Sequence, residues 1–146
     1  NMPALLRAVA EKFTPQLQRA GVEIKVEADA VLPVISADGD RLAQVFTNLV
    51  DNALKFTPRA GVITLLASVV NGEMQVTVSD TGAGIPIESQ AHIFDRFYRS
   101  TAAVKQTKGA GLGLYLARAI IESHGGHIWA DPQPGAGARI CFSLPR

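Results

Sequence analysis

The sequence predicts a two-layer α/β (α+β) sandwich, in which a mixed, mainly antiparallel sheet of about five strands packs against three helices. Segments with three- and four-residue apolar spacing occur together with shorter segments of two-residue alternation. An Asn71-Gly72 dipeptide joins two of the short segments, which indicates a hairpin of antiparallel strands. The chain has 146 residues, 47% of them hydrophobic, and this is enough for one domain with a sizeable buried core.

The N-terminal part of the chain predicts a helix followed by two strands. Leucine, valine and phenylalanine recur at helical spacing over residues 4–19, which is typical of an amphipathic helix, although Pro15 weakens its second half. Residues 22–27 alternate apolar and charged side chains, as a half-buried strand does. A short second strand is expected through Val34 and Ile35.

The middle of the chain predicts a long helix and the hairpin. Asp38 or Asp40 can cap a helix that continues to about Thr57, where a proline follows and stops it. The hairpin strands are expected at residues 62–70 and 74–79, on either side of the Asn-Gly turn.

The last part of the chain predicts a helix and two closing strands behind a long irregular stretch. About 30 residues with glycine, proline and little periodicity follow the hairpin, and such a length is uncommon in a compact domain unless it is functional. A short aromatic segment around residues 93–98 interrupts this stretch. A helix is then expected at residues 112–123, ended by two glycines, and strands at residues 127–130 and 138–144.

Three polar residues of the long helix share one face. Asn48, Asn52 and Lys55 lie at i, i+4 and i+7, beside the apolar face of the helix. Such a face suits a pocket wall, because amide oxygens are hard ligands for Mg²⁺ and an ammonium group binds phosphate oxygens. A helix with solvated amides would give the same spacing, so the face alone does not establish a site.

Asp80 ends the second hairpin strand with the same parity as the apolar residues of that strand, which places its carboxylate on the core side. A carboxylate there needs a donor. The exocyclic amine of adenine supplies one, whereas guanine presents a carbonyl oxygen at that place. Gly82 and Gly84 allow a tight turn that approaches a flat base closely, with Ile85 as an apolar contact. The alternative is an ordinary Asp-Gly turn after a strand.

A second glycine motif, formed by Gly109, Gly111 and Gly113, leads into the helix at residues 112–123, where free N–H groups can cradle phosphates. The motif lacks the lysine and hydroxyl of a Walker loop, and no predicted strand precedes it, which disfavours a Rossmann fingerprint. Residues 96–121 contain five basic residues and no acidic one. This composition suits a flap over a triphosphate, and equally a solvated cationic loop. These basic residues are Arg96, Arg99, Lys105, Lys108 and Arg118.

In their order and spacing, these motifs closely resemble those of the catalytic and ATP-binding domain of sensor histidine kinases, within the wider family that includes gyrase, MutL and the heat-shock chaperone ATPases. The four motifs are NLVDNALKF (N box), DTGAGIP (first glycine box), IFDRFYR (F box) and GAGLGL (second glycine box). The resemblance runs from about Leu5 to Pro145. It implies a Bergerat-type ATP-binding fold, a single catalytic domain over residues 1–146 and a lid at about residues 99–110.

The resemblance also implies roles for individual residues, with ATP and Mg²⁺ as cofactors. Asn52 is expected to bind Mg²⁺, with Asn48 and Lys55 near the phosphates, as the catalytic set. Phe56 is expected to lie beside the base, and Asp80 to read the adenine amine. The other expected nucleotide-binding residues are Gly82, Gly84, Ile85, Lys108, Gly109, Gly111, Leu112 and Gly113.

Asn48 bears on the reaction. The resemblance implies that hydrolytic members of the wider family carry a glutamate at this position, four residues before the asparagine that binds Mg²⁺. That glutamate activates water as a general base. Asparagine is a poor base, so transfer of the γ-phosphoryl to a histidine on a separate dimerisation domain is favoured, with a response regulator as the downstream recipient. Two alternatives remain open: a non-catalytic ATP-sensing module and a self-sufficient ATPase.

Composition and histidine placement limit the partners. Fourteen basic and 13 acidic residues give a net charge of +1, so neither nucleic acid nor direct membrane contact is expected. Cys141, the only cysteine, cannot form an internal disulfide, which indicates a cytoplasmic domain whose parent protein can still be membrane-anchored. No histidine lies on an N-terminal helix followed by an acidic residue, so we expect the dimerisation and phosphoacceptor domain to be absent from this chain.

Overall fold

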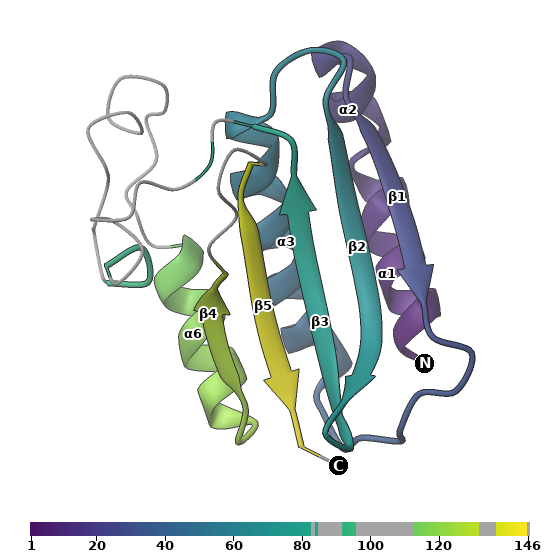
Figure 1. Cartoon of the computed structure of the whole chain (residues 1–146), viewed down its shortest axis with the longest axis vertical. Coiled ribbons are helices and arrows are strands. Elements are labelled where there is room, and N and C mark those ends of the chain that lie inside the picture. The colour runs from purple at the N-terminus through teal and green to yellow at the C-terminus, as the bar shows by residue number, and fades with distance from the viewer. Residues whose placement is uncertain (83, 85–91, 96–112, 132–136, 146) are drawn as a thin grey trace.

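The computed structural model describes residues 1–82, 84, 92–95, 113–131 and 137–145, and these form a sheet with helices behind it (Figure 1). The helices are α1 (Met2–Lys12), α2 (Thr14–Ala20), α3 (Gly39–Phe56) and α6 (Gly113–Ser123). The strands are β1 (Glu23–Ala28), β2 (Val62–Val70), β3 (Glu73–Asp80), β4 (His127–Ala130) and β5 (Arg139–Leu144).

The five strands form one mixed sheet in the order β1-β2-β3-β5-β4. β1 runs parallel to β2, and the other three neighbouring pairs are antiparallel. Figure 1 shows α1, α3 and α6 behind the sheet, and none of the helices in the described residues covers its other face. The predicted two-layer α/β sandwich with a mainly antiparallel sheet is confirmed.

The single helix predicted for residues 4–19 is wrong, because the structure divides it at Phe13 into α1 and α2. Proline has no N–H, and its ring clashes with the helical carbonyl four residues earlier, so a helix tolerates it only in the first turn. Pro15 occupies that first turn in α2. The apolar spacing continues across the break, with Phe13 and Leu17 both buried.

The short strand predicted at Val34 and Ile35 is also wrong, because residues 33–38 have no regular structure. Val34 is 92% exposed, whereas Ile35 packs against the core from a loop. A strand needs a neighbour with which to exchange hydrogen bonds, and Pro33 removes one donor from this segment.

The predicted hairpin and long helix are confirmed. Val70 and Glu73 are the last paired residues on either side of the turn, and Asn71 and Gly72 take φ angles of 53° and 80°, as a two-residue hairpin of this type requires. Asp38 caps α3 by accepting hydrogen bonds from the backbone N–H groups two and three residues later.

The core lies between the helices and the sheet. α3 buries one face, and Phe46 from this face meets Phe142 of β5 with ring centroids 5.5 Å apart. This packing fixes α3 against the middle of the sheet, so that the C-terminal ends of α3 and β3 lie at the same, upper end of the molecule in Figure 1. Of the helices that the structure describes, none is long and apolar enough to cross a membrane.

Candidate nucleotide site

Asp80 is a buried carboxylate at the end of β3, on the core side as predicted, with 7% of its surface exposed. Its Oδ1 accepts hydrogen bonds from the backbone N–H of Gly82 at 2.8 Å and of Ala138 at 3.4 Å. Burial raises the pKa of Asp80, and the two N–H donors oppose this rise. Within the described part of the chain, Oδ2 has no hydrogen-bond partner, so this oxygen can accept from a ligand.

The first glycine motif lies directly against the end of α3. A Cβ atom added to Gly82 would lie 2.3 Å from the carbonyl oxygen of Phe56, closer than any side chain permits. Gly84 has a φ of 85°, a conformation that L side chains rarely adopt. The same added Cβ would lie 3.0 Å from Asp80 Oδ1, so the missing side chain at Gly82 lets the carbonyl of Phe56, the last residue of α3, lie close to the Asp80 carboxylate.

Asn48 connects α3 to the start of α6. Its Nδ2 donates a hydrogen bond to the carbonyl oxygen of Gly113 at 3.1 Å, across 65 residues of sequence. Gly113 is both the first residue of α6 and the last glycine of the second glycine motif. The amide nitrogen is therefore engaged, and the half-buried side chain keeps its Oδ1 as the remaining acceptor.

Asn52 and Lys55 continue the polar face of α3. The half-buried Asn52 amide makes no hydrogen bond to any residue that the structure describes, so its oxygen is available as a hard ligand of the kind Mg²⁺ prefers. Lys55 instead forms an ion pair with Asp51, with Nζ 3.3 Å from Oδ2. Both side chains of this pair are about half exposed, so its contribution is small and Lys55 can exchange its partner for a phosphate.

Comparison with protein families identifies the arrangement. A model of the histidine kinase-, DNA gyrase B- and HSP90-like ATPase family matches residues 37–146. The chain belongs to this family. The match covers all of α3, the hairpin and α6, which are the elements that carry the residues described above.

Curated relatives narrow the branch to sensor histidine kinases. The adaptive-response sensory kinase SasA of Thermosynechococcus vestitus is 50% identical over 146 residues, which cover 99% of this chain and 38% of that protein. The sensor protein DivL of Caulobacter vibrioides is 42% identical over 141 residues, covering 97% of this chain and 18% of that protein. The chain thus spans well under half the length of these relatives.

Solved structures show the same branch. The nucleotide-free catalytic domain of the histidine kinase ThkA superposes with a TM-score of 0.86 at 32% identity, covering 99% of this chain and 92% of that one. Full-length ShkA in complex with AMPPNP gives a TM-score of 0.87 at 36% identity, covering 99% of this chain and 30% of that one. This chain corresponds to the catalytic ATPase domain of sensor histidine kinases.

Several residues expected in this ATPase site lie outside the described residues. They are Ile85, Lys108, Gly109, Gly111 and Leu112, together with the lid expected at residues 99–110. The structure therefore brings together the N box, Asp80, Gly82, Gly84 and Gly113, and the roles of all these residues toward a nucleotide remain predictions.

Ala138 belongs to the site although sequence reasoning missed it. Its backbone N–H donates to Asp80, while its carbonyl accepts from the backbone N–H of Asp80 at 2.9 Å. Hydrogen bonds made by backbone groups cannot be predicted from the pattern of side chains in the sequence. The available signal was the Gly-Ala-Gly-Ala run before the last strand, which has the small residues that a close backbone approach needs.

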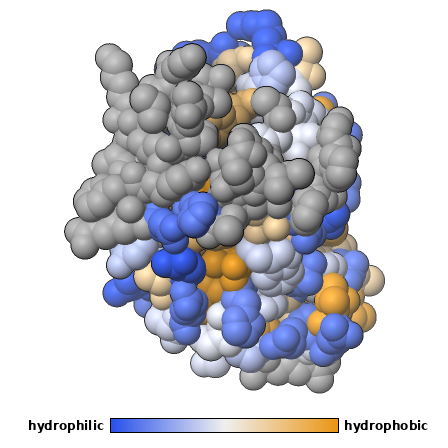
Figure 2. Space-filling model, turned by 60° about the vertical axis from the view of Figure 1, so that its left-hand side comes forward, coloured by the Kyte–Doolittle hydropathy of each residue, from blue (hydrophilic) through white to orange (hydrophobic). Residues whose placement is uncertain are grey.

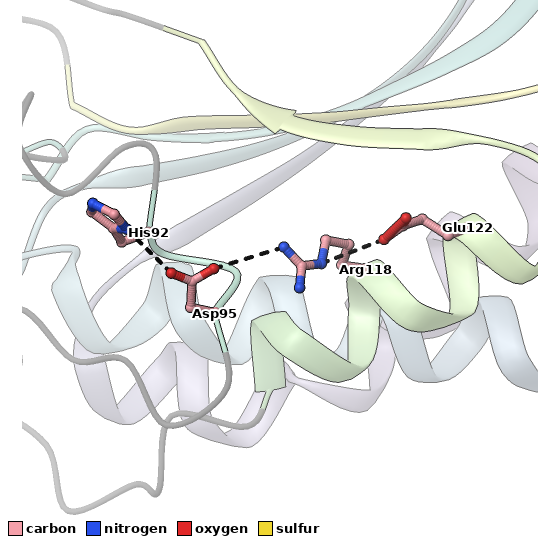
Figure 3. A network of polar contacts seen from close by, with 4 residues as sticks. All are labelled: His92, Asp95, Arg118 and Glu122. Carbon is pink, nitrogen blue, oxygen red and sulfur yellow. Dashed lines mark hydrogen bonds and ion pairs between the residues drawn. The ribbon is translucent and has the colours of Figure 1, made fainter.

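The F box is anchored on the helical layer. Phe94 is 7% exposed and belongs to the core, while Phe97 lies outside the described residues. Asp95 reaches α6 through Arg118, with 3.9 Å between Oδ1 and a guanidinium nitrogen (Figure 3). This contact between the F box and α6 was not predicted from the sequence.

A separate groove of about 400 Å³ lies along α6, near the N-terminal end of α3. It is lined by Asp38, Arg41, Gln44, Leu116, Ala119, Ile120, Ser123 and His124. Figure 2 turns the α6 side of the molecule forward and shows a small hydrophobic area among hydrophilic side chains. The groove residues on α3 come from the first turns of that helix, whereas Asn48 and Asn52 lie in its second half, so the groove is separate from the candidate nucleotide site.

Proposed function

We propose that this chain binds Mg-ATP and presents the γ-phosphoryl group to a histidine on a separate dimerisation domain. The observation that carries the proposal is the Asp80 carboxylate, buried beside the end of the N box with Oδ2 unused by the described residues. The exocyclic amine of adenine is the donor that fits it, and guanine would oppose two oxygen atoms there. The full-length ShkA structure supports the proposal, because that related kinase was solved with AMPPNP, an ATP analogue.

The phosphate end of the nucleotide would extend along the polar face of α3. The Asn52 oxygen fits a Mg²⁺ ion, and Asn48 holds the glycine at the start of α6. Bound Mg²⁺ would neutralise charge on the transferring phosphoryl group, which is the main demand of phosphoryl transfer. Lys55 would leave Asp51 to contribute a further positive charge.

The acceptor is inferred to be an imidazole rather than water. Asn48 is engaged with Gly113 and is in any case a poor base, so the position at which hydrolytic relatives carry a glutamate offers no group that removes a proton from water. An imidazole nitrogen of neutral histidine is already nucleophilic and needs only to be held in line. We expect the acceptor on a dimerisation domain outside this chain, and a response regulator aspartate as the next recipient. The related kinase ThkA has been solved in complex with the response regulator protein TrrA.

The need for ATP and the presence of a single thiol indicate the cellular compartment of the domain. We place the domain in the cytoplasm, where ATP is available and the single thiol, the buried Cys141, stays reduced. The parent protein can reach the membrane through other segments.

Nucleotide binding tests the first half of the proposal. Calorimetric titration of the 146-residue chain should show binding of Mg-ATP, weaker binding of Mg-GTP, and little phosphate release. Asn52→Ala should weaken Mg-ATP binding at least about tenfold, because it removes a metal ligand. Gln44→Ala, an exposed amide of the same helix, is the matched control and should bind as wild type does. Unchanged binding by Asn52→Ala would remove the role given to Asn52.

Phosphoryl transfer tests the second half. The parent protein, incubated with γ-labelled ATP, should acquire a label that is labile in acid and stable in alkali, as expected for phosphohistidine. Binding without any transfer would favour the ATP-sensing alternative. Steady phosphate release by the 146-residue chain, lost with Asn52→Ala, would favour a self-sufficient ATPase.

A further inference from the structure

The two residues before β5 pack directly on Asp80. β3 ends and β5 begins at the same, upper end of the sheet, where Figure 1 shows the two strands side by side. The backbone N–H of Asp80 donates to the carbonyl of Ala138 at 2.9 Å, and the backbone N–H of Ala138 donates to Asp80 Oδ1 at 3.4 Å. Ala138 therefore contacts both the backbone and the carboxylate of Asp80.

Gly137 makes this close approach possible. A Cβ atom added to Gly137 would overlap the carbonyl oxygen of Asp80 and would lie 3.1 Å from the backbone nitrogen of Gly82. The φ of Gly137 is 84°, a conformation that L side chains rarely adopt. The neighbouring atoms belong to the backbone and not to a flexible side chain, so a side chain at this position would have to displace the turn that follows Asp80.

The turn that Gly137 contacts is also the turn that holds the carboxylate. The N–H of Gly82 donates to Asp80 Oδ1 at 2.8 Å from within this turn, and the N–H of Ala138 reaches the same oxygen from the β5 side. Two donors from different segments restrict the rotation of a carboxylate more than one donor does. Oδ1 is therefore used within the protein, and Oδ2 keeps a fixed direction toward a ligand donor.

The first glycine box packs on Gly137 as well. A Cβ atom added to Gly84 would lie 3.2 Å from the carbonyl oxygen of Gly137. Gly137 thus lies between Asp80 and Gly84, and a shift at Gly137 would be transmitted to both. Because hydrogen bonds weaken steeply when donor and acceptor are misaligned, even a small rotation of the Asp80 carboxylate would weaken its bond to a ligand.

We propose that Gly137 is a positioning residue for adenine recognition, because it lets residues 137–138 hold the Asp80 carboxylate with Oδ2 toward the exocyclic amine of the base. This inference rests on the proposed ATP-binding function and deepens it. A purine without the exocyclic amine gains nothing from the direction of Oδ2, so its affinity should not depend on Gly137.

The test compares Mg-ATP with the magnesium complex of purine riboside triphosphate, which differs from ATP only in lacking the exocyclic amine. Calorimetric titration of the 146-residue chain gives both dissociation constants, and their ratio measures the contact with the amine. The wild-type chain should bind Mg-ATP about tenfold or more tightly than the analogue, as expected for a hydrogen bond to a charged acceptor. Gly137→Ala should reduce this preference to about twofold or less by weakening Mg-ATP alone.

Gly72→Ala is the matched control for backbone strain. Gly72 has a φ of 80°, close to that of Gly137, but a Cβ atom added there would meet nothing within 4 Å. Gly72→Ala should lower the urea midpoint of unfolding and leave the preference for Mg-ATP unchanged. If Gly137→Ala also lowers only the midpoint, or weakens both ligands equally, Gly137 has a structural role and the inference is overturned.

Ala138→Pro is a second variant that adds no Cβ atom at Gly137. Proline removes the N–H that donates to Asp80 Oδ1 and keeps the carbonyl that accepts from Asp80. The preference for Mg-ATP should fall by about two- to fivefold, less than in Gly137→Ala, because the Gly82 donor remains. This result decides the question if Gly137→Ala does not fold. If neither variant folds, these residues serve the fold and the inference is overturned.

The failure of the inference can be distinguished from the failure of the proposed function. If the wild-type chain does not bind Mg-ATP, the proposed function is wrong. If it binds Mg-ATP and the analogue equally well, the role of Asp80 toward the amine is wrong. If the wild-type chain prefers Mg-ATP and Gly137→Ala keeps that preference, only the role of Gly137 is wrong.

Discussion

Asp80 is a buried carboxylate whose charge the described residues only partly compensate. Two backbone N–H groups donate to Oδ1, but burial still raises the pKa of the group. Ionised Asp80 therefore lowers the stability of the ligand-free protein while it prepares an acceptor for a ligand donor. The recognition that we propose for Asp80 would therefore lower the stability of the ligand-free fold.

Asp80→Asn should separate these two effects. The amide oxygen can still accept from Gly82 and Ala138, and no buried charge remains, so the free energy of unfolding at pH 7 should be equal to or above that of wild type. Mg-ATP binding should fall about tenfold or more, because a hydrogen bond to a charged acceptor is lost. Urea denaturation and calorimetric titration measure the two quantities.

The pH dependence of stability provides the control for Asp80→Asn. Because the folded-state pKa is raised above 3.8, the folded protein holds a proton that the unfolded chain releases, and the stability contributed by this proton is lost as pH rises through the folded pKa. The variant has no such loss. Its advantage over wild type should be smallest below pH 3.8 and should grow toward neutral pH. A constant difference in the free energy of unfolding between the variant and wild type across this pH range would show that ionisation of Asp80 does not destabilise the fold.

At the scale of elements, the hydrogen bond from Asn48 to Gly113 holds α3 and α6 together at the site. Asn48→Asp has nearly the same shape but replaces the donor with an oxygen that faces the Gly113 carbonyl. We expect weaker Mg-ATP binding at neutral pH, by about two- to tenfold for one hydrogen bond, and partial recovery at lower pH as the new carboxyl group becomes protonated and donates again. Fluorescence titration with a labelled nucleotide at several pH values measures this.

The same variant tests why the chain should not hydrolyse ATP. Asn48→Asp places a carboxylate in the position of the hydrolytic glutamate, but with a shorter side chain and a broken link to α6. Phosphate release should stay at the wild-type level. A clear rise in steady phosphate release would show that the charge alone decides between hydrolysis and transfer.

Over the whole molecule, local patterns predicted most of the fold and much of the site. The Asn71-Gly72 turn, the cap at Asp38 and the inward parity of Asp80 each depend on neighbouring residues, and all three were found where predicted. The strand expected at Val34 failed for the opposite reason, because a strand exists only where a partner supplies hydrogen bonds.

The contacts that the sequence did not predict are those between distant segments. They include Asn48 with Gly113, Asp95 with Arg118, and the hydrogen bond from the backbone N–H of Asp38 to His124, which spans 86 residues. Neither helical nor strand periodicity carries information about such pairs. The first two connect motifs of the candidate site, so the sequence motifs predicted its residues, whereas only the tertiary structure shows how the elements that carry them are held.

The two layers of the molecule are joined by Phe46 and Phe142, both fully buried, and this makes Phe142 a test of the whole fold. Phe142→Ala should lower the free energy of unfolding by about 3–5 kcal/mol, because it removes buried apolar surface and leaves a cavity. Val70→Ala, at a site 40% exposed, is the control and should stay within about 0.5 kcal/mol of wild type. Urea denaturation measures both changes.

Mg-ATP should restore much of what Phe142→Ala loses. The substitution lies in the middle of the sheet and leaves Asp80 and the polar face of α3 in place, so the folded variant should bind with the wild-type dissociation constant. A ligand at 100 times its dissociation constant stabilises the folded state by about 2.7 kcal/mol. The urea midpoint of the variant should therefore rise with Mg-ATP as far as that of wild type does. A variant that is folded but no longer binds Mg-ATP would show that the packing between the layers also shapes the nucleotide site.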